Sequence, residues 1–449
     1  MKDNEIEKLR LKIDDVDSEI LNLLSKRSGI VSEIGEHKSK NTAVVDLNRE
    51  EMVLNRLLDK AQGNYSKDTI IRIWREIFEA SSKLQISKNS SIETKRSIGG
   101  IKPYKGGKSS AIGSSRIIKL SSNENSHGPS PKILQKIEIN KITNLINRYP
   151  EIDGLSIRNK IGELNNINPD QIVLGCGSDE VLLFAALAFC KDGDEIIQAE
   201  HGFEMYPIIA KIVGAVTRFA KEDSKYRVSI KSICDQVTDS TKLIYLANPN
   251  NPTGNYLNKN ELIELMNSIP KNVIVVIDGA YAEYVMEKNF DKDFTLVDRF
   301  ENIILTRTFS KSYGLAGLRI GWCYTGKRVS EILNKVKGPF NTAFLSQQIA
   351  LVALDDQNYI NEVVNKNNAI KNWFEKELEK INIKTLPSFA NFSFLETTTN
   401  HAIKISDHLQ KDGIIIRQLD SYNLSHCLRI TIGTQEEMQS TINSLKKLQ

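Results

Sequence analysis

Lys311 is the residue in this sequence whose position most strongly suggests chemistry. It follows the apolar run 302–306, a predicted strand, and lies in a loop of small residues. In α/β proteins, functional groups gather at the carboxyl ends of strands. A lysine in such a loop can form a Schiff base with an aldehyde cofactor. Taken alone, however, a loop lysine is more commonly a solvated surface charge.

Three further loops follow predicted strands and carry groups that suit such a cofactor. The segment 175–180 leads into an apolar helix, so its backbone N–H groups and the Ser178 hydroxyl form a seat for a phosphate. Asn251 is placed to contact a ring oxygen, and Asp278, with Tyr281 one turn on, can keep a pyridine nitrogen protonated. Each motif alone is more often a turn or a helix cap. Together they favour pyridoxal phosphate as the cofactor.

Two other regions place cations beside apolar residues. Arg429 lies on a predicted strand, where an unpaired charge is costly to bury, so it should meet an anion. Arg417, earlier in the same region, is either a surface charge or a second anion site. Near the N-terminus, Arg27 and Lys38 stand about three helical turns apart. This spacing suggests an anion site, although a solvated helix face is the default explanation.

The elements that must position these residues differ along the chain. Residues 4–85 carry apolar residues at three- and four-residue steps without a proline, which predicts three amphipathic helices. Their core is small, so packing against a partner chain is expected. Residues from about 86 to 115 are rich in Ser, Lys and Gly and predict a linker. Beyond it, helical stretches alternate with β-branched runs at 171–174, 195–197, 242–246, 272–277 and 302–305. That alternation is typical of an α/β domain with a largely parallel sheet.

The composition narrows the class of protein. The chain has 449 residues, 40% of them hydrophobic and 26% charged, with a formal net charge of +4. These values predict a globular protein of two or three domains and give no reason to expect nucleic acid as a partner. The five cysteines form no Cys-x-x-Cys pair, so neither disulfides nor a metal site are predicted, and a reducing cytoplasm is expected. We recognise no targeting signal or membrane-spanning stretch and expect no membrane partner.

Residues from about 99 to the end resemble the fold-type I, pyridoxal-phosphate-dependent aminotransferases, most closely the histidinol-phosphate branch. The resemblance rests on six motifs in order: Asn-Glu-Asn (123–125), Arg-Tyr-Pro (148–150), Gly-Ser-Asp-Glu (177–180), Asn-Asn-Pro-Thr-Gly (250–254), Asp-x-Ala-Tyr (278–281) and Ser-Lys-x-x-x-Leu-Ala-Gly-Leu-Arg (310–319). It implies an aminotransferase over 116–449, after a linker and N-terminal arm at 87–115. The large doubly wound domain would cover about 145–340, and a small α/β domain would combine 341–449 with the N-terminal part.

The same resemblance implies a role for each residue of this site. Lys311 would hold the cofactor and move protons, Asp278 would pair with the pyridinium nitrogen, and Asn251 and Tyr281 would contact the ring hydroxyl. The other cofactor-binding residues would be Gly177, Ser178, Asp179, Phe203, Ser310, Arg319 and, from the second protomer, Tyr149. Substrate would contact Tyr104, Asn251, Arg417 and Arg429. Arg429 would take the α-carboxylate and Arg417 a second acidic group, which is the phosphate in the histidinol-phosphate branch.

Residues 4–86 resemble the all-helical chorismate mutases, which implies a three-helix domain over 1–86. The residues that match the family's site in order are Arg10, Arg27, Lys38, Asp46, Arg49, Glu50, Ser81 and Gln85. The resemblance implies that Arg27, Arg49 and the partner chain's Arg10 bind the carboxylates of chorismate. Lys38 and Gln85 would donate to its ether oxygen, Glu50 would accept from the ring hydroxyl, and Ser81 and Asp46 would support the site. Both families imply a homodimer.

Three functions remain open. Because fusions of consecutive steps are more economical than fusions of unrelated ones, we expect both sites to serve aromatic amino acid biosynthesis. The aminotransferase would then act on prephenate, phenylpyruvate or 4-hydroxyphenylpyruvate, with glutamate as the expected donor. In the first alternative it is a histidinol-phosphate aminotransferase with a fused mutase. In the second, the helical domain is a non-catalytic regulatory or dimerisation module, which is disfavoured because a scaffold has no need of Glu50 and Gln85 beside the full set of cations.

Overall fold

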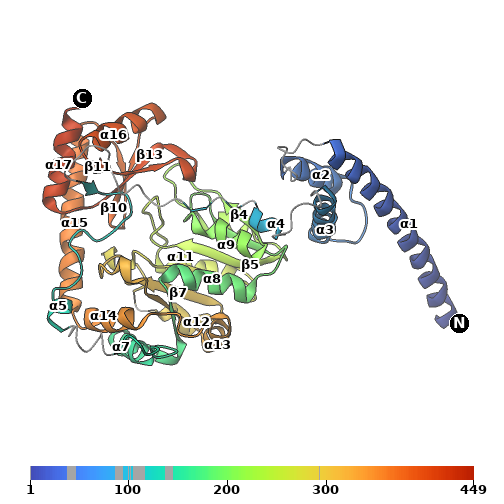
Figure 1. The fold of residues 1–449 in the computed structure, drawn as a ribbon, viewed down its shortest axis with the longest axis horizontal. Coiled ribbons are helices and arrows are strands. Elements are labelled where there is room, and N and C mark those ends of the chain that lie inside the picture. The colour runs from blue at the N-terminus through green and yellow to red at the C-terminus, as the bar shows by residue number, and fades with distance from the viewer. Residues whose placement is uncertain are drawn as a thin grey trace. The chain divides into compact units, whose positions relative to one another are not determined.

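The computed structural model describes residues 2–37, 47–85, 95–99, 101, 103–104, 117–136, 145–292 and 294–448. The chain forms two compact units, Met1–Gly100 and Ile101–Gln449. Each unit is described by itself below (Figure 1).

The first unit is helical, which confirms the predicted fold class for this part of the chain. Its helices are α1 (Lys2–His37), α2 (Leu47–Lys60), α3 (Lys67–Gln85) and the short α4 (Arg96–Gly99). Both α1 and α2 contact α3. Val31 and Phe78 are buried where the helices meet. Among the described residues, much of α1 is not covered by other elements. Its exposed apolar residues include Ile6, Leu9, Leu11, Ile13, Val16, Ile20, Leu21, Leu23, Ile30 and Ile34.

The second unit is built around a seven-stranded sheet in the order β2-β8-β7-β6-β5-β3-β4. The strands are β2 (Ile172–Gly175), β3 (Glu195–Ala199), β4 (Val216–Ala220), β5 (Thr241–Ala247), β6 (Ile274–Asp278), β7 (Ile303–Thr308) and β8 (Gly321–Thr325). The strands from β4 to β7 run parallel, whereas β8 is antiparallel to both of its neighbours. The largely parallel sheet predicted from the alternating runs is therefore confirmed.

Helices cover both faces of this sheet. One face packs on α8 (Ser178–Phe189), α9 (Met205–Val213) and α13 (Lys327–Val336). The other packs on α7 (Leu155–Asn165), α10 (Ile230–Cys234), α11 (Lys259–Ser268), α12 (Thr295–Arg299) and α14 (Phe344–Leu354). Along β6, Val275 and Ile277 point to one cluster while Ile274 and Val276 point to the other. Since successive side chains in a strand alternate between faces, a strand covered on both sides must be apolar throughout, as this one is.

A smaller antiparallel sheet follows in sequence, in the order β12-β13-β10-β9. Its strands are β9 (Thr385–Leu386), β10 (Phe392–Glu396), β12 (Arg417–Leu419) and β13 (Leu424–Thr431). Helices α15 (Gln357–Lys380), α16 (Thr399–Lys411) and α17 (Gln435–Lys446) pack with it (Figure 1). A parallel pair, β1 (Ile118–Lys119) with β11 (Ile414–Ile415), ties the beginning of the unit to this part. The short α5 (Lys132–Lys136) lies against α14.

The sheet topology also explains why separate loops meet. Because β5, β6 and β7 are parallel neighbours, their carboxyl ends lie at one edge of the sheet. The loops that carry Asn251, Asp278 and Lys311 all leave from that edge. Among the described residues, no helix is both long and apolar enough to cross a membrane.

Candidate active site

A cavity of about 360 Å³ opens at this edge of the large sheet. Its walls combine the strand-end loops with residues of the small sheet and of the segments just before and after β1. Predicted site residues that line it are Tyr104, Ser178, Asp179, Phe203, Asn251, Asp278, Tyr281, Ser310, Lys311, Arg319, Arg417 and Arg429. The structure therefore brings twelve of the predicted residues, from distant parts of the chain, to one site.

Asp278 is buried at the end of β6, with 5% of its surface exposed. One carboxylate oxygen accepts a 3.0 Å hydrogen bond from Tyr206 Oη, and the other accepts one of 3.0 Å from Thr306 Oγ1. Burial raises the pKa of Asp278 above its usual value. The two hydroxyls and the Ala280 backbone N–H that hold this carboxylate are all neutral, so it favours a cationic partner, and a protonated pyridine nitrogen is such a partner.

The Lys311 amine lies in the same cavity, where its Nζ donates to the Ser122 carbonyl oxygen at 3.2 Å. It also stands 5.7 Å from the centre of the Tyr281 ring. Burial, with help from the positive charge of Arg429, lowers the pKa of Lys311 to about 8. Near neutral pH a much larger fraction of this amine is therefore neutral than in a solvated lysine, and the neutral form is the one that attacks an aldehyde.

Tyr281 is held by a residue to which sequence reasoning gave no role. Its hydroxyl accepts a 2.8 Å hydrogen bond from Asn123 Nδ2. Asn123 has a left-handed backbone with φ 55°, and Thr431 on β13 binds both its N–H and its side-chain oxygen. Asparagine tolerates that backbone better than most residues. Burial raises the pKa of Tyr281 to about 12, so the phenol stays protonated.

A candidate binding site for an anion lies at the N-terminus of α8. Gly177 precedes the helix with φ 80°, a backbone conformation that favours glycine, and the Arg319 guanidinium occupies the space where a side chain would begin. Arg319 also donates to Ser310 Oγ at 3.2 Å and pairs with Asp179 at 3.4 Å. Guanidinium, hydroxyl and helix N–H groups together match the requirements of a phosphate.

Arg429 is a buried cation on β13, with 5% of its surface exposed. Its guanidinium donates to Asn251 Oδ1 and, at 2.8 Å, to the Ser121 carbonyl oxygen. Its Nε is buried and has no hydrogen-bond partner among the described residues. Because the acceptors are neutral oxygens, they leave the positive charge available to an anionic ligand.

Arg417, the first residue of β12, is paired differently. Its Nη2 lies 3.1 Å from Glu204 Oε2, and the two side chains are 13% and 14% exposed. Tyr104 lies near this pair: burial raises the pKa of its phenol, while the charge of Arg417 lowers it and that of Glu204 raises it. The part of the cavity around Arg417, which we call its far end, thus presents an ion pair and a phenol rather than a lone cation.

Two aromatic residues predicted for the cofactor site stand in different places. Phe203 lines the cavity and meets Tyr206 edge to face at 5.7 Å. Tyr149 is 80% exposed and stacks on Phe340 at 4.5 Å. It is not among the described residues that line this chain's own cavity.

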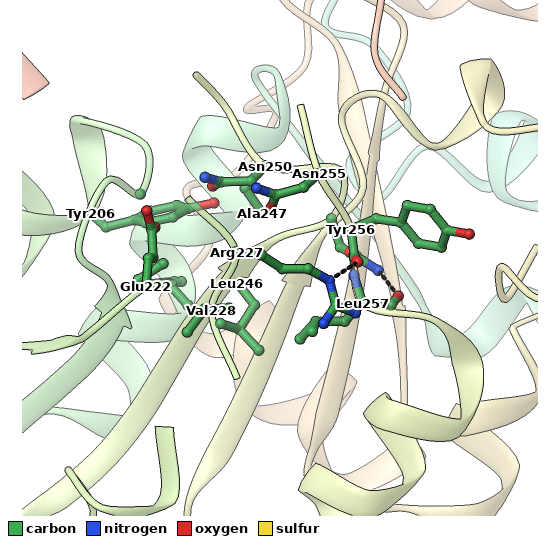
Figure 2. Close-up of a pocket in the computed structure, with 14 residues that line it drawn as sticks. Tyr206, Glu222, Arg227, Val228, Leu246, Ala247, Asn250, Asn255, Tyr256 and Leu257 are labelled. Carbon is green, nitrogen blue, oxygen red and sulfur yellow. Dashed lines mark hydrogen bonds between the residues drawn. The ribbon is translucent and has the colours of Figure 1, made fainter. Parts of the chain in front are cut away.

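A second, small cavity of about 10 Å³ shares the lining residue Ala247 with the large one. Figure 2 shows Tyr206 and Glu222 at one side of it and Arg227 at the other, where Arg227 Nε donates to the Tyr256 carbonyl oxygen at 3.3 Å. Its volume suits about one water molecule, not a substrate. The cavity that contains Lys311 is therefore the candidate substrate site.

The helical unit brings together part of the second predicted site. Arg27 on α1 donates to Ser81 Oγ on α3 and lies 5.8 Å from the centre of the Phe78 ring. Burial lowers the pKa of Arg27, so the cation is partly withdrawn from water. On α2, Glu50 is half-buried and Arg49 is exposed.

Arg10 is not gathered with these residues in one chain. Arg10 is exposed and pairs with Glu7 at 3.3 Å. It stands about 25 Å from Arg27 along the straight helix α1, so the two cannot hold one small ligand within a chain. Lys38 and Asp46 lie outside the described residues, as does the side chain of Gln85 at the end of α3.

Sequence reasoning missed several residues that hold this site together. They are Tyr206 and Thr306 beside Asp278, Asn123 beside Tyr281, and Glu204 beside Arg417. The Asn-Glu-Asn motif could have drawn attention to Asn123 as a residue suited to a left-handed backbone. Tyr206 on α9, Thr306 on β7 and Glu204 just before α9 are of residue types that carry no signal at those positions.

Comparisons with known proteins agree with this geometry. Residues 115–445 match the family model "Aminotransferase class I and II", and residues 9–86 match "Chorismate mutase type II". Histidinol-phosphate aminotransferase from Ruegeria pomeroyi is 38% identical over 344 residues, which are 76% of this chain and 94% of that protein. The corresponding protein from Pelagibacter ubique is 38% identical over 351 residues, 78% of this chain and 97% of its own.

A solved structure is similar as well. Histidinol-phosphate aminotransferase from Sinorhizobium meliloti, in complex with pyridoxal-5'-phosphate, superimposes with a TM-score of 0.69 at 25% identity, covering 74% of this chain and 90% of that one. Pyridoxal 5'-phosphate is the cofactor of such aminotransferases. The groups present here suit it: a buried carboxylate, a lysine of lowered pKa and an anion seat at a helix N-terminus. The chain belongs to the class I and II aminotransferase family and carries a type II chorismate mutase domain before the aminotransferase.

Proposed function

We propose that the second unit transfers the amino group of glutamate to imidazole-acetol phosphate, forming histidinol phosphate, while the first converts chorismate to prephenate. The observation that carries the first assignment is the 38% identity to a histidinol-phosphate aminotransferase over 94% of that protein. The main expectation from sequence, an aromatic oxo acid or prephenate, has less support than this alternative. It remains the second candidate because the fused mutase domain produces prephenate.

The residues of the large cavity have separate tasks in amino transfer. When bound, pyridoxal phosphate supplies an aldehyde that takes up the amino group and a ring that accepts electrons. Lys311 holds it covalently at rest and then moves protons at the amine-bearing carbon of the substrate. Asp278 keeps the pyridine nitrogen protonated, and Asn251 and Tyr281 contact the ring hydroxyl. The phosphate and ring are bound by Gly177, Ser178, Asp179, Phe203, Ser310 and Arg319, with Tyr149 from the partner subunit.

The substrate is held by its charged groups. We assign the anion beside the reacting carbon to Arg429, because that arginine is buried and its acceptors are neutral. Arg417 takes a second acidic group, such as the far carboxylate of glutamate, and Tyr104 and Asn251 complete the contacts. Sequence reasoning placed the phosphate of the histidinol-phosphate branch at Arg417. The carboxylate of Glu204 beside Arg417 favours Arg429 for that phosphate instead.

In the mutase domain, catalysis needs no acid, base or nucleophile from the protein. Chorismate must be held in a compact conformer while charge develops on its ether oxygen. Arg27, Arg49 and the partner chain's Arg10 bind its carboxylates. Lys38 and Gln85 donate to the ether oxygen, Glu50 accepts from the ring hydroxyl, and Ser81 and Asp46 support the site. Ser81 already bonds Arg27 in the structure.

The active protein is proposed to be a homodimer located in the cytoplasm. The apolar residues along α1 would remain in water in a single chain, at a considerable cost in free energy. A second α1 would cover them and would carry its own Arg10 toward the Arg27 site. All five cysteines are free thiols, as suits a reducing compartment.

The experiment that tests the amino-transfer assignment compares histidinol phosphate with histidinol as amino donors to 2-oxoglutarate. The two differ only in the phosphate. Charge-assisted hydrogen bonds to Arg429 predict that kcat/KM falls by about a hundredfold or more when the phosphate is absent. Equal kcat/KM values for the two would contradict the assignment.

A further inference from the structure

Glu204 places a negative charge beside the second arginine of the cavity. It immediately precedes α9, between Phe203 and Met205, both of which line the cavity. Its Oε2 accepts from Arg417 Nη2 at 3.1 Å, across 213 residues of sequence. Both side chains are largely buried, so the pair is weakly screened by water.

The two arginines of the cavity therefore differ in charge compensation. Arg429 donates to neutral oxygens of Asn251 and Ser121. Arg417 faces a carboxylate. An anion that approaches Arg429 meets an uncompensated cation, whereas an anion that approaches Arg417 must compete with Glu204 and then lie close to it.

An aminotransferase cavity has to accept two different substrates in turn. Glutamate carries a carboxylate at each end. Histidinol phosphate carries one anionic arm and one imidazole arm on its amine-bearing carbon. With the anionic arm at Arg429, the far end of the cavity must hold a carboxylate in one half of the reaction and an uncharged ring in the other.

We propose that Glu204 determines this substrate range, because it neutralises Arg417 whenever the substrate offers no carboxylate to that arginine. The proposal rests on the proposed amino transfer between glutamate and a phosphorylated imidazole substrate. When the far end of the substrate is uncharged, Glu204 stays paired with Arg417 and continues to compensate its buried positive charge. When the far end is a carboxylate, the substrate displaces Glu204 from Arg417. The displacement weakens glutamate binding and so keeps the cavity from favouring the dicarboxylate.

The imidazole arm adds a second reason for a carboxylate at this place. A neutral imidazole carries one N–H donor, which the free lone pairs of Glu204 can accept. A phenyl ring carries no such donor. Glu204 therefore favours imidazole over phenyl at the far end, whereas Arg417 alone would favour a carboxylate.

The test uses the full-length holoenzyme and measures the two half-reactions separately, with glutamate and with histidinol phosphate. In Glu204→Gln, the side chain keeps its shape but no longer compensates Arg417. The ratio of kcat/KM for glutamate to that for histidinol phosphate should rise about tenfold, mainly through tighter glutamate binding. The matched control is Glu200→Gln, which removes the same charge from an exposed position of the same loop and should leave the ratio within about twofold.

A ratio in Glu204→Gln that stays within about twofold of wild type, in protein that retains the cofactor's absorption, would overturn the proposal. Arg417→Gln provides a second route if the first variant fails to fold. It should lower the same ratio about tenfold, and an unchanged ratio there would also overturn the proposal.

If wild type does not react with histidinol phosphate at all, the proposed function is wrong. In that case phenylalanine replaces histidinol phosphate as the substrate with an uncharged far end. The ratio of kcat/KM for glutamate to that for phenylalanine should rise about tenfold in Glu204→Gln, and a ratio within about twofold of wild type would overturn the role of Glu204.

Discussion

Asn251 and Arg429 are joined by a hydrogen bond although they are 178 residues apart in the sequence. Asn251 lies in the loop after β5, and Arg429 lies on β13 of the small sheet. The bond connects a residue assigned to the cofactor ring with the arginine assigned to the substrate anion. With these assignments, we expect cofactor binding and substrate binding to be coupled through this side-chain contact.

Replacing Asn251 should therefore affect both ligands. In Asn251→Ala, the Arg429 guanidinium loses an acceptor, and removal of a partner from a buried charged group costs about 1–3 kcal/mol. We expect KM for glutamate to rise and affinity for pyridoxal phosphate to fall, each by about tenfold or more. Steady-state kinetics and cofactor titration measure the two effects. A change in only one of them would contradict the coupling.

Replacing Lys311 should separate the two activities of the chain. Lys311→Ala removes the amine that holds the cofactor, so amino transfer and the cofactor's bound absorption should be lost. Chorismate turnover should stay within about twofold of wild type, since no residue of the mutase site is changed. Parallel assays on one preparation provide the measurement. Loss of both activities in folded protein would show that the two sites are not independent.

The lowered pKa of Lys311 predicts how cofactor uptake depends on pH. Only the neutral amine attacks an aldehyde, and burial brings the pKa of Lys311 to about 8 from the ordinary lysine value of 10.5. The rate at which cofactor-free protein takes up pyridoxal phosphate should rise with pH around a midpoint of about 8. In Arg429→Gln, one positive charge that lowers this pKa is gone, so the midpoint should move to higher pH. A midpoint near that of a solvated lysine would contradict the burial effect.

Replacing Arg27 should remove mutase activity and spare amino transfer. In Arg27→Ala, a carboxylate of chorismate loses its cation, which costs about 2–5 kcal/mol of transition-state binding, by analogy with buried charge pairs. Lys83→Ala, on the same helix as Ser81 but in an exposed ion pair with Glu79, is the control and should change kcat/KM little. Absorbance assays of chorismate consumption follow both variants. Chorismate binding without turnover in wild type would instead favour a regulatory helical domain.

Catalytic and cofactor-binding residues could be predicted from the sequence where they lie near the ends of predicted strands. Lys311, Asp278 and Asn251 could be found because each directly follows an apolar run, and parallel strands bring their carboxyl ends to one edge. The helical unit was predicted from periodic apolar residues alone. The same periodicity could not predict what covers the apolar side chains of α1, because an apolar helix face can be buried either by the same chain or by a partner chain.

Which residues meet through long-range contacts could not be predicted from local patterns. Asn123 reaches Tyr281 across 158 positions, and Glu204 reaches Arg417 across 213. Nothing in the residues near Glu204 distinguishes it from a solvated acid before a helix. Its role depends on the return of β12 to the edge of the large sheet, which is a property of the folded chain.

The central claim is the identity of the amino acceptor, and one competition experiment tests it most directly. Imidazole-acetol phosphate, prephenate, phenylpyruvate and 4-hydroxyphenylpyruvate are offered together to the holoenzyme with glutamate as donor, and the amino products are quantified. We predict that histidinol phosphate is the main product, exceeding each of the others by about tenfold or more, because only its precursor combines a phosphate for Arg429 with an uncharged N–H ring for the far end. Predominant amination of prephenate or of either aromatic oxo acid would contradict the account and restore the aromatic assignment.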